Sequence, residues 1–105
     1  MTKMSTDTST TKRIEPKLDL KPPGKYQVIF MNDDVTPMDF VVAVLHDIFD
    51  HDYESAAKLT MQIHEQGSAV VALLSYELAE HKAIEVTVLA RNNNFPLDVK
   101  VKPND

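Results

Sequence analysis

Residues 26–41 read Tyr26-Gln-Val-Ile-Phe-Met-Asn-Asp-Asp-Val-Thr-Pro-Met-Asp-Phe-Val41 and contain the signals for three consecutive elements. The first six residues are mostly apolar, which predicts a buried β-strand. Residues 32–34 are an asparagine and two aspartates, side chains that bond to their own backbone in turns, so they predict a loop. Thr36 followed by Pro37 predicts a helix start, with Thr36 as the N-cap and Asp39 completing a capping box. A strand, an acidic loop and a helix therefore succeed one another within 16 residues.

Two helices are predicted in the next part of the chain. Phe40, Val44 and Ile48 recur every four residues, which indicates that the first helix turns an apolar stripe inward. The second helix begins with Asp52 as its N-cap and ends at Gly67, because glycine is common just after the last helical residue.

A third helix and two further strands complete the pattern. Ser75 predicts the N-terminus of this helix, and the asparagine run at 92–94 predicts its end. Residues 69–74 (AVVALL) are apolar on both faces, which predicts a central strand. Apolar residues at 97, 99 and 101 alternate with charged ones, which predicts a half-buried strand. The order β-α-α-β-α-β predicts an α/β two-layer sandwich, in which a three-stranded sheet carries three helices on one side.

The chain of 105 residues has room for one folded domain. Its first 11 residues include seven Ser or Thr, and no apolar periodicity appears before Pro22-Pro23-Gly24. We therefore expect a disordered N-terminal extension over residues 1–24 and a core domain over residues 25–105. The absence of cysteine excludes disulfides and is compatible with a reducing cytoplasm, and no apolar run approaches the roughly 20 residues of a membrane span.

Charge is distributed unevenly along the chain. Residues 1–24 carry five basic and three acidic residues, whereas residues 25–105 carry six basic and thirteen acidic residues. A domain with a balance of −7 repels phosphate backbones and anionic lipid, so nucleic acid and membrane surfaces are not expected partners. A cationic partner is favoured instead.

No motif of a known enzyme class is present, and no enzyme activity is expected. His46, His51 and His81 stand in polar surroundings and are interpreted as solvated surface residues. His64 lies partly on the packed side of the second predicted helix. A small metal-dependent hydrolase using Asp33, Asp34 and His64 is one hypothesis for the acidic loop, although the ligand spacing of a calcium loop is absent.

The segment Asn32-Asp-Asp-Val-Thr-Pro-Met38 resembles the signature N-D-D-x-T-P-M of the ClpS adaptor family. The resemblance extends over residues 21–102. It also includes Lys21-Pro22-Pro23, Ile63-His64-x-x-Gly67, Glu77-x-Ala79-Glu80-x-Lys82, Ala90-Arg91 and Pro96-Leu97.

The resemblance implies a bacterial adaptor that binds N-degrons, proteins whose first residue is Leu, Phe, Tyr or Trp. It implies delivery to the ClpA unfoldase of the ClpAP protease through the ClpA N-terminal domain, aided by the N-terminal extension. The family does no chemistry of its own, so no metal or cofactor is expected. A cytoplasmic, monomeric protein is expected as well. A non-adaptor interaction module of similar sandwich fold is the alternative.

The resemblance also assigns residues to these tasks. The substrate α-amino group is expected to be bound by Asn32, Asp33 and His64, and the peptide backbone to be contacted by Thr36. The side chain of the first residue is expected in a hydrophobic pocket formed by Met38, Val41, Thr60, Ile63 and Leu97. Docking to ClpA is assigned to Glu77 and Lys82. Position 60 departs from the family pattern, which usually has a second Met there, so the size preference of the pocket is expected to differ.

Overall fold

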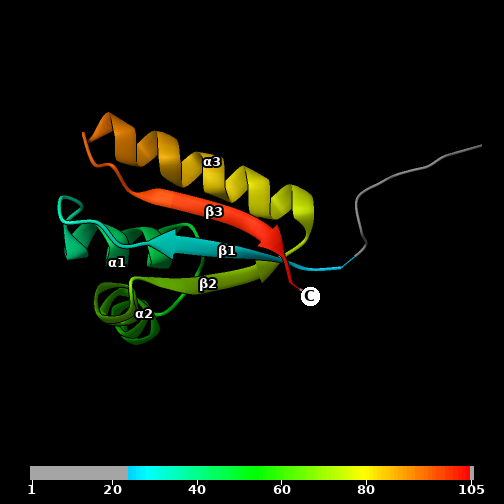
Figure 1. Cartoon of the computed structure of the whole chain (residues 1–105), viewed down its shortest axis with the longest axis horizontal. Coiled ribbons are helices and arrows are strands. Elements are labelled where there is room, and N and C mark those ends of the chain that lie inside the picture. Colours follow the sequence, from blue (N-terminus) through cyan, green and yellow to red (C-terminus); the bar gives the residue numbers. More distant parts are fainter. Residues whose placement is uncertain (1–23, 105) are drawn as a thin grey trace, which may run out of the picture.

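The computed structural model of the protein describes residues 24–104 (Figure 1). Six elements follow one another along the chain: β1 (Tyr26–Met31), α1 (Met38–Asp47), α2 (Tyr53–Gln66), β2 (Ser68–Leu74), α3 (Tyr76–Asn92) and β3 (Asp98–Pro103). This is the predicted order. The predicted N-terminal extension lies outside the described residues, except for Gly24.

The sheet is antiparallel, with β1 between β2 and β3 (Figure 1). Tyr26 pairs with Leu74 of β2 and with Pro103 of β3. The prediction that residues 69–74 form the central strand is therefore wrong, because β2 lies at an edge. Its apolar outer face is left to solvent, where Val70 is 42% and Leu73 48% exposed.

The register between β1 and β2 contains a β-bulge. Val28 pairs with Ala72 and Ile29 with Val70, so Val71 is an extra residue in β2. The carbonyl oxygen of Val71 accepts a hydrogen bond from Nε2 of His51, at 2.7 Å.

One face of the sheet packs on the helices and forms the core. Tyr26, Val28 and Phe30 alternate along β1 and are buried, whereas the residues between them are only partly covered. Leu45 of α1 and Val86 of α3 belong to the same core cluster. The predicted two-layer sandwich is confirmed. No helix within residues 24–104 has the length and apolarity that crossing a bilayer requires.

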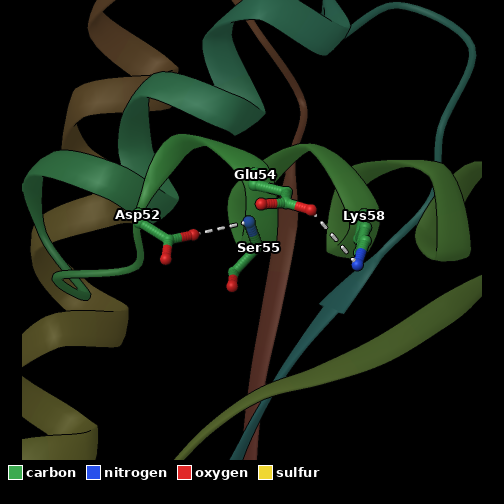
Figure 2. A network of polar contacts seen from close by, with 4 residues as sticks. All are labelled: Asp52, Glu54, Ser55 and Lys58. Carbon is green, nitrogen blue, oxygen red and sulfur yellow. Dashed lines mark hydrogen bonds and ion pairs between the residues drawn. The ribbon is translucent and has the colours of Figure 1, made fainter.

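The ends of α2 are those predicted. The carboxylate of Asp52 accepts a hydrogen bond from the backbone N–H of Ser55 at 2.7 Å, and Glu54 pairs with Lys58 one turn later (Figure 2). Gly67 follows the helix with a φ of 92°, a left-handed conformation that favours glycine.

The predicted capping box of α1 does not form. The helix begins at Met38, and Pro37 stands at the N-cap without a side-chain hydrogen bond. The Thr36 hydroxyl donates instead to a carboxylate oxygen of Asp33, at 2.8 Å. The Asp33 carboxylate is an ionised acceptor, and hydrogen bonds to ionised groups are stronger than neutral ones. Thr36 is therefore a member of the acidic loop rather than a helix cap.

Candidate functional site

A small hollow of about 20 Å³ lies between the β1–α1 loop, the second half of α2 and the segment before β3. Its lining includes all nine residues predicted to bind a substrate: Asn32, Asp33, Thr36, Met38, Val41, Thr60, Ile63, His64 and Leu97. The tenth lining residue, Met31, was not predicted. Met31 is the last residue of β1, directly before the acidic loop, and this position is the signal by which it could have been found.

The acidic loop is tied to the end of α2 through its backbone. The N–H of Asn32 donates to the carbonyl oxygen of Gly67 at 2.9 Å. His64 lies one turn earlier on α2 and lines the same hollow. The side chains of Asn32 and His64 are exposed, so the polar groups form a rim that water and ligands can reach.

Asp33 is held by three hydrogen bonds from its own loop. One carboxylate oxygen, Oδ1, accepts from the N–H groups of Val35 and Thr36 at 2.8 and 2.7 Å. The other, Oδ2, accepts from the Thr36 hydroxyl. A carboxylate has about four acceptor sites, so about one site at Oδ2 stays available for a further donor.

The same contacts keep Asp33 ionised. Burial by itself would raise the pKa of Asp33, but the hydrogen bonds from Thr36 and Val35 and the positive charge of Arg91 outweigh it. The pKa of Asp33 therefore lies below its usual value, and the rim carries a fixed negative charge at neutral pH.

The base of the hollow is apolar. Val41, Ile63 and Leu97 are at most 5% exposed. Thr60 is 4% exposed, and its hydroxyl donates to the carbonyl oxygen of Ala56 at 2.8 Å. That bond satisfies the hydroxyl within α2, which leaves the methyl group as the apolar contribution of Thr60.

Met38 stands at the mouth of the hollow as the first residue of α1, with 39% of its surface exposed. A thioether side chain is flexible and adapts to the shape of its surroundings. Met38 is therefore a lining side chain that can change its conformation to admit a ligand.

The residues predicted to dock an unfoldase lie on α3, and neither lines the hollow. Glu77 is exposed in the first turn. Lys82 is half-buried, and its Nζ donates to the carbonyl oxygen of Ile48 at 2.6 Å, 5.8 Å from the ring centroid of Phe49. Lys82 thus stabilises the C-terminal end of α1.

His46 and His51 take part in the packing of the α1–α2 connection. His46 stacks on Tyr53 with ring centroids 3.9 Å apart, and its Nδ1 donates to the carbonyl oxygen of His51. Together with the bond from His51 to β2, this corrects the interpretation of both as solvated surface residues. His81 is exposed, as predicted.

The geometry also bears on the hypothesis of a metal-dependent hydrolase. Within residues 24–104, no three His, Cys, Asp or Glu side chains gather in a way that suits a metal ion. Asp33 already uses three of its acceptor sites within the loop. The site therefore favours a ligand with N–H donors over a metal.

Comparison with known proteins agrees with this geometry. Residues 21–100 match the family model described as "ATP-dependent Clp protease adaptor protein ClpS". The ATP-dependent Clp protease adapter protein ClpS of Treponema denticola is 49% identical over 80 residues, which are 76% of this chain and 79% of that protein. Its counterpart in Sodalis glossinidius is 46% identical over 78 residues, 74% of each chain.

A solved structure is similar as well. The structure of Agrobacterium tumefaciens ClpS2 bound to L-phenylalaninamide superposes with a TM-score of 0.76 and is 37% identical in sequence. The match covers 79% of this chain and all of that one. The family match, the curated relatives and the fold agree, and the chain belongs to the ClpS family of Clp protease adaptors.

Proposed function

We propose that the hollow binds the first residue of N-degron proteins, those beginning with Leu, Phe, Tyr or Trp. The observation that carries this proposal is the convergence of an anionic, hydrogen-bonding rim and an apolar base in one hollow. An N-terminal residue of this kind presents both an ammonium group and an apolar side chain within a few ångströms. The ClpS2 relative supports the assignment, since L-phenylalaninamide also has a free amino group beside a benzyl side chain.

The α-amino group is mostly an ammonium at neutral pH, with three N–H donors. Three acceptors match it: the side-chain oxygen of Asn32, the remaining site on Asp33 and a ring nitrogen of neutral His64. The Thr36 oxygen, which donates its own hydrogen to Asp33, accepts from the peptide backbone. The protein acts in this scheme by binding alone, without catalysis, cofactor or metal.

The first side chain enters the apolar base between Met38, Val41, Thr60, Ile63 and Leu97. The hollow of about 20 Å³ has room for little more than one water molecule, so a Leu or Phe side chain requires Met38 to swing outward. Burial of that side chain contributes roughly 1.5–3 kcal/mol, and each charge-assisted hydrogen bond about 1.5–3 kcal/mol. Offset by the loss of freedom on association, these contributions correspond to an affinity near micromolar, about −8 kcal/mol.

The adaptor then delivers its cargo to the ClpA unfoldase in the cytoplasm. Docking to the ClpA N-terminal domain is assigned to α3, where Glu77 presents an exposed charge and Lys82 fixes the adjoining end of α1. Residues 1–24 are assigned to the delivery step, and residues 25–105 to recognition and docking. We expect the adaptor to act as a monomer, without nucleic acid or membrane as partners.

A peptide titration tests the recognition step. Peptides that differ only in their first residue are titrated into the protein, each with a free and with an acetylated amino end. We expect Phe-first and Leu-first peptides to bind and acetylation to weaken binding at least about 100-fold, because it removes the charge and leaves acceptors unpaired. Equal affinity of free and acetylated peptides would contradict the proposal.

A further inference from the structure

Arg91, in the last turn of α3, is bonded to the backbone segment that carries one wall of the hollow. Its Nη1 donates to the carbonyl oxygens of Phe95 and Leu97, at 2.9 Å each. Leu97 belongs to the apolar base and is 1% exposed. The positive charge of Arg91 acts at the same time on Asp33, in the anionic rim. Arg91 thus contacts the segment that carries the base, and it acts on the rim only through its charge.

The segment that carries Leu97 is tied to α3 through its first half, where the N–H groups of Asn93, Asn94 and Phe95 donate to carbonyl oxygens of the last turn. Residues 93–97 connect α3 to β3 and belong to neither element. Pro96 has no N–H to donate. The N–H of Phe95 is bonded to the last turn of α3, at 2.9 Å, and its ring packs edge-on against Phe40, with centroids 4.9 Å apart. Among the polar contacts of this segment, those from Arg91 are the ones that reach the backbone of Leu97 itself.

The shape of the guanidinium group matters more here than its charge. Arg91 is exposed, so water and salt weaken its attraction to Asp33. Its hydrogen bonds to two carbonyl groups, by contrast, require a rigid planar donor at the right distance from both. A lysine at this position keeps the charge but offers a flexible point donor instead.

We infer that Arg91 is a positioning residue of the binding hollow, which fixes the Leu97 wall of the apolar base without contacting the ligand. This inference rests on the proposed function, because it assigns Arg91 to the same site. Without these two bonds the segment before β3 is freer to shift, and the base loses its fit to the first side chain. The rim, held by its own hydrogen bonds, is affected less.

The test compares two ligands on the full chain. Peptides beginning with Phe and with Ala are titrated into the wild type, Arg91→Met and Arg91→Lys. A Phe side chain uses the Leu97 wall and an Ala side chain hardly does, whereas both use the rim. We expect the ratio of the Phe-peptide affinity to the Ala-peptide affinity to be about tenfold lower in Arg91→Met than in the wild type. In Arg91→Lys this ratio should be at most about threefold higher than in Arg91→Met. Lys58→Met, which removes an exposed charge on α2, serves as the matched control and should keep the wild-type preference.

The ratio of two affinities separates positioning from a loss of folded protein. Partial unfolding lowers the apparent affinity for both peptides equally and leaves their ratio unchanged. If Arg91→Met does not fold, the ratio measured with Arg91→Lys decides. A wild-type preference in the folded Arg91 variants overturns the inference while the proposed function stands. Failure of the wild type to bind either free peptide overturns the proposed function itself.

Discussion

The hollow and a second depression, the α3–β3 groove, differ in size and chemistry. The groove has a volume of about 290 Å³ and is lined by Glu80, Ala83, Ile84, Thr87, Val88, Val99 and Val101. Ile84 and Val88 are more than half exposed there, and the Thr87 hydroxyl is bonded within α3, to the carbonyl oxygen of Ala83. The hollow is more than ten times smaller, yet four side chains with donors or acceptors line its rim: Asn32, Asp33, Thr36 and His64.

The difference teaches that specificity depends on converging polar groups rather than on volume. An apolar groove open to solvent accepts many partners weakly, because the wrong ligand leaves no polar group of the groove without a hydrogen-bond partner. In the binding mode proposed for the hollow, a ligand without an ammonium group leaves the remaining acceptor site of Asp33 unpaired. Four pairs of measurements sharpen or break this comparison.

The largest difference is expected between two isoleucines. Ile63 lies in the base of the hollow and is 4% exposed, whereas Ile84 lines the groove and is 59% exposed. We expect Ile63→Ala to lower the free energy of unfolding by about 2–4 kcal/mol and to weaken peptide binding. Ile84→Ala should change stability by no more than about 0.5 kcal/mol and leave binding unchanged. Denaturant unfolding and peptide titration measure both. Weaker binding in Ile84→Ala would make the groove part of the site.

The second pair compares neighbouring carboxylates. Asp33 is fixed by three hydrogen bonds, while Asp34 is exposed beside it. Asp33→Asn should weaken the binding of a Phe-first peptide about 10- to 100-fold, because the ammonium loses its charged acceptor. Asp34→Asn should change it by no more than about twofold. Similar losses of affinity in both variants would mean that the loop attracts the ligand only through its net negative charge and not through a specific bond to Asp33.

The third pair concerns position 60. Thr60→Met places a larger side chain at the base, so a Trp-first peptide should lose roughly tenfold more affinity than a Leu-first peptide. Thr60→Val keeps the volume and removes the bond to Ala56, so it should lower stability without changing the ranking of first residues. An identical ranking in wild type and Thr60→Met would show that this residue does not limit the ligand.

The smallest effect is a pH dependence of stability. The pKa of Asp33 is below its usual value in the folded chain, so its contribution is present above the unfolded pKa of about 3.9 and is lost as pH falls toward the folded pKa. The free energies of unfolding of wild type and Asp33→Asn should therefore differ more at pH 7 than at pH 3. An equal difference at both pH values would contradict the lowered pKa of Asp33.

Local signals in the sequence predicted most of the elements. The apolar run at residues 26–31 predicted β1, although only every second side chain is buried. Asp52 and Gly67 predicted the ends of α2 because capping depends on neighbouring residues alone. The same local logic misassigned Thr36. As an N-cap its hydroxyl oxygen would accept from a backbone N–H of the helix, whereas in the fold the hydroxyl donates to Asp33, and the sequence does not rank these two bonds. Residues 69–74 were misplaced in the sheet because composition does not reveal which strand has two neighbours.

The site was predicted from the family resemblance rather than from the residues alone. Asn32 and His64 are 32 positions apart, and their elements are brought together by the pairing of Met31 with Ser68 and the bond from Asn32 to Gly67. Arg91 was quoted as part of a motif but given no role. Its action depends on two carbonyl groups in an irregular segment, and hydrogen bonds of side chains to distant or irregular backbone leave no periodic signal.

The bulge at Val71 has a consequence for how copies of this protein meet one another. The edge strand β2 has the sequence SAVVALL, without a charge or a proline, and such edges tend to pair with a second chain. The extra residue interrupts the regular spacing of its free backbone groups, and His51 occupies the Val71 carbonyl. Loss of this contact in His51→Ala should promote self-association, visible as increased light scattering on heating. The short connection between α1 and α2 therefore covers part of the edge at which a second copy would pair.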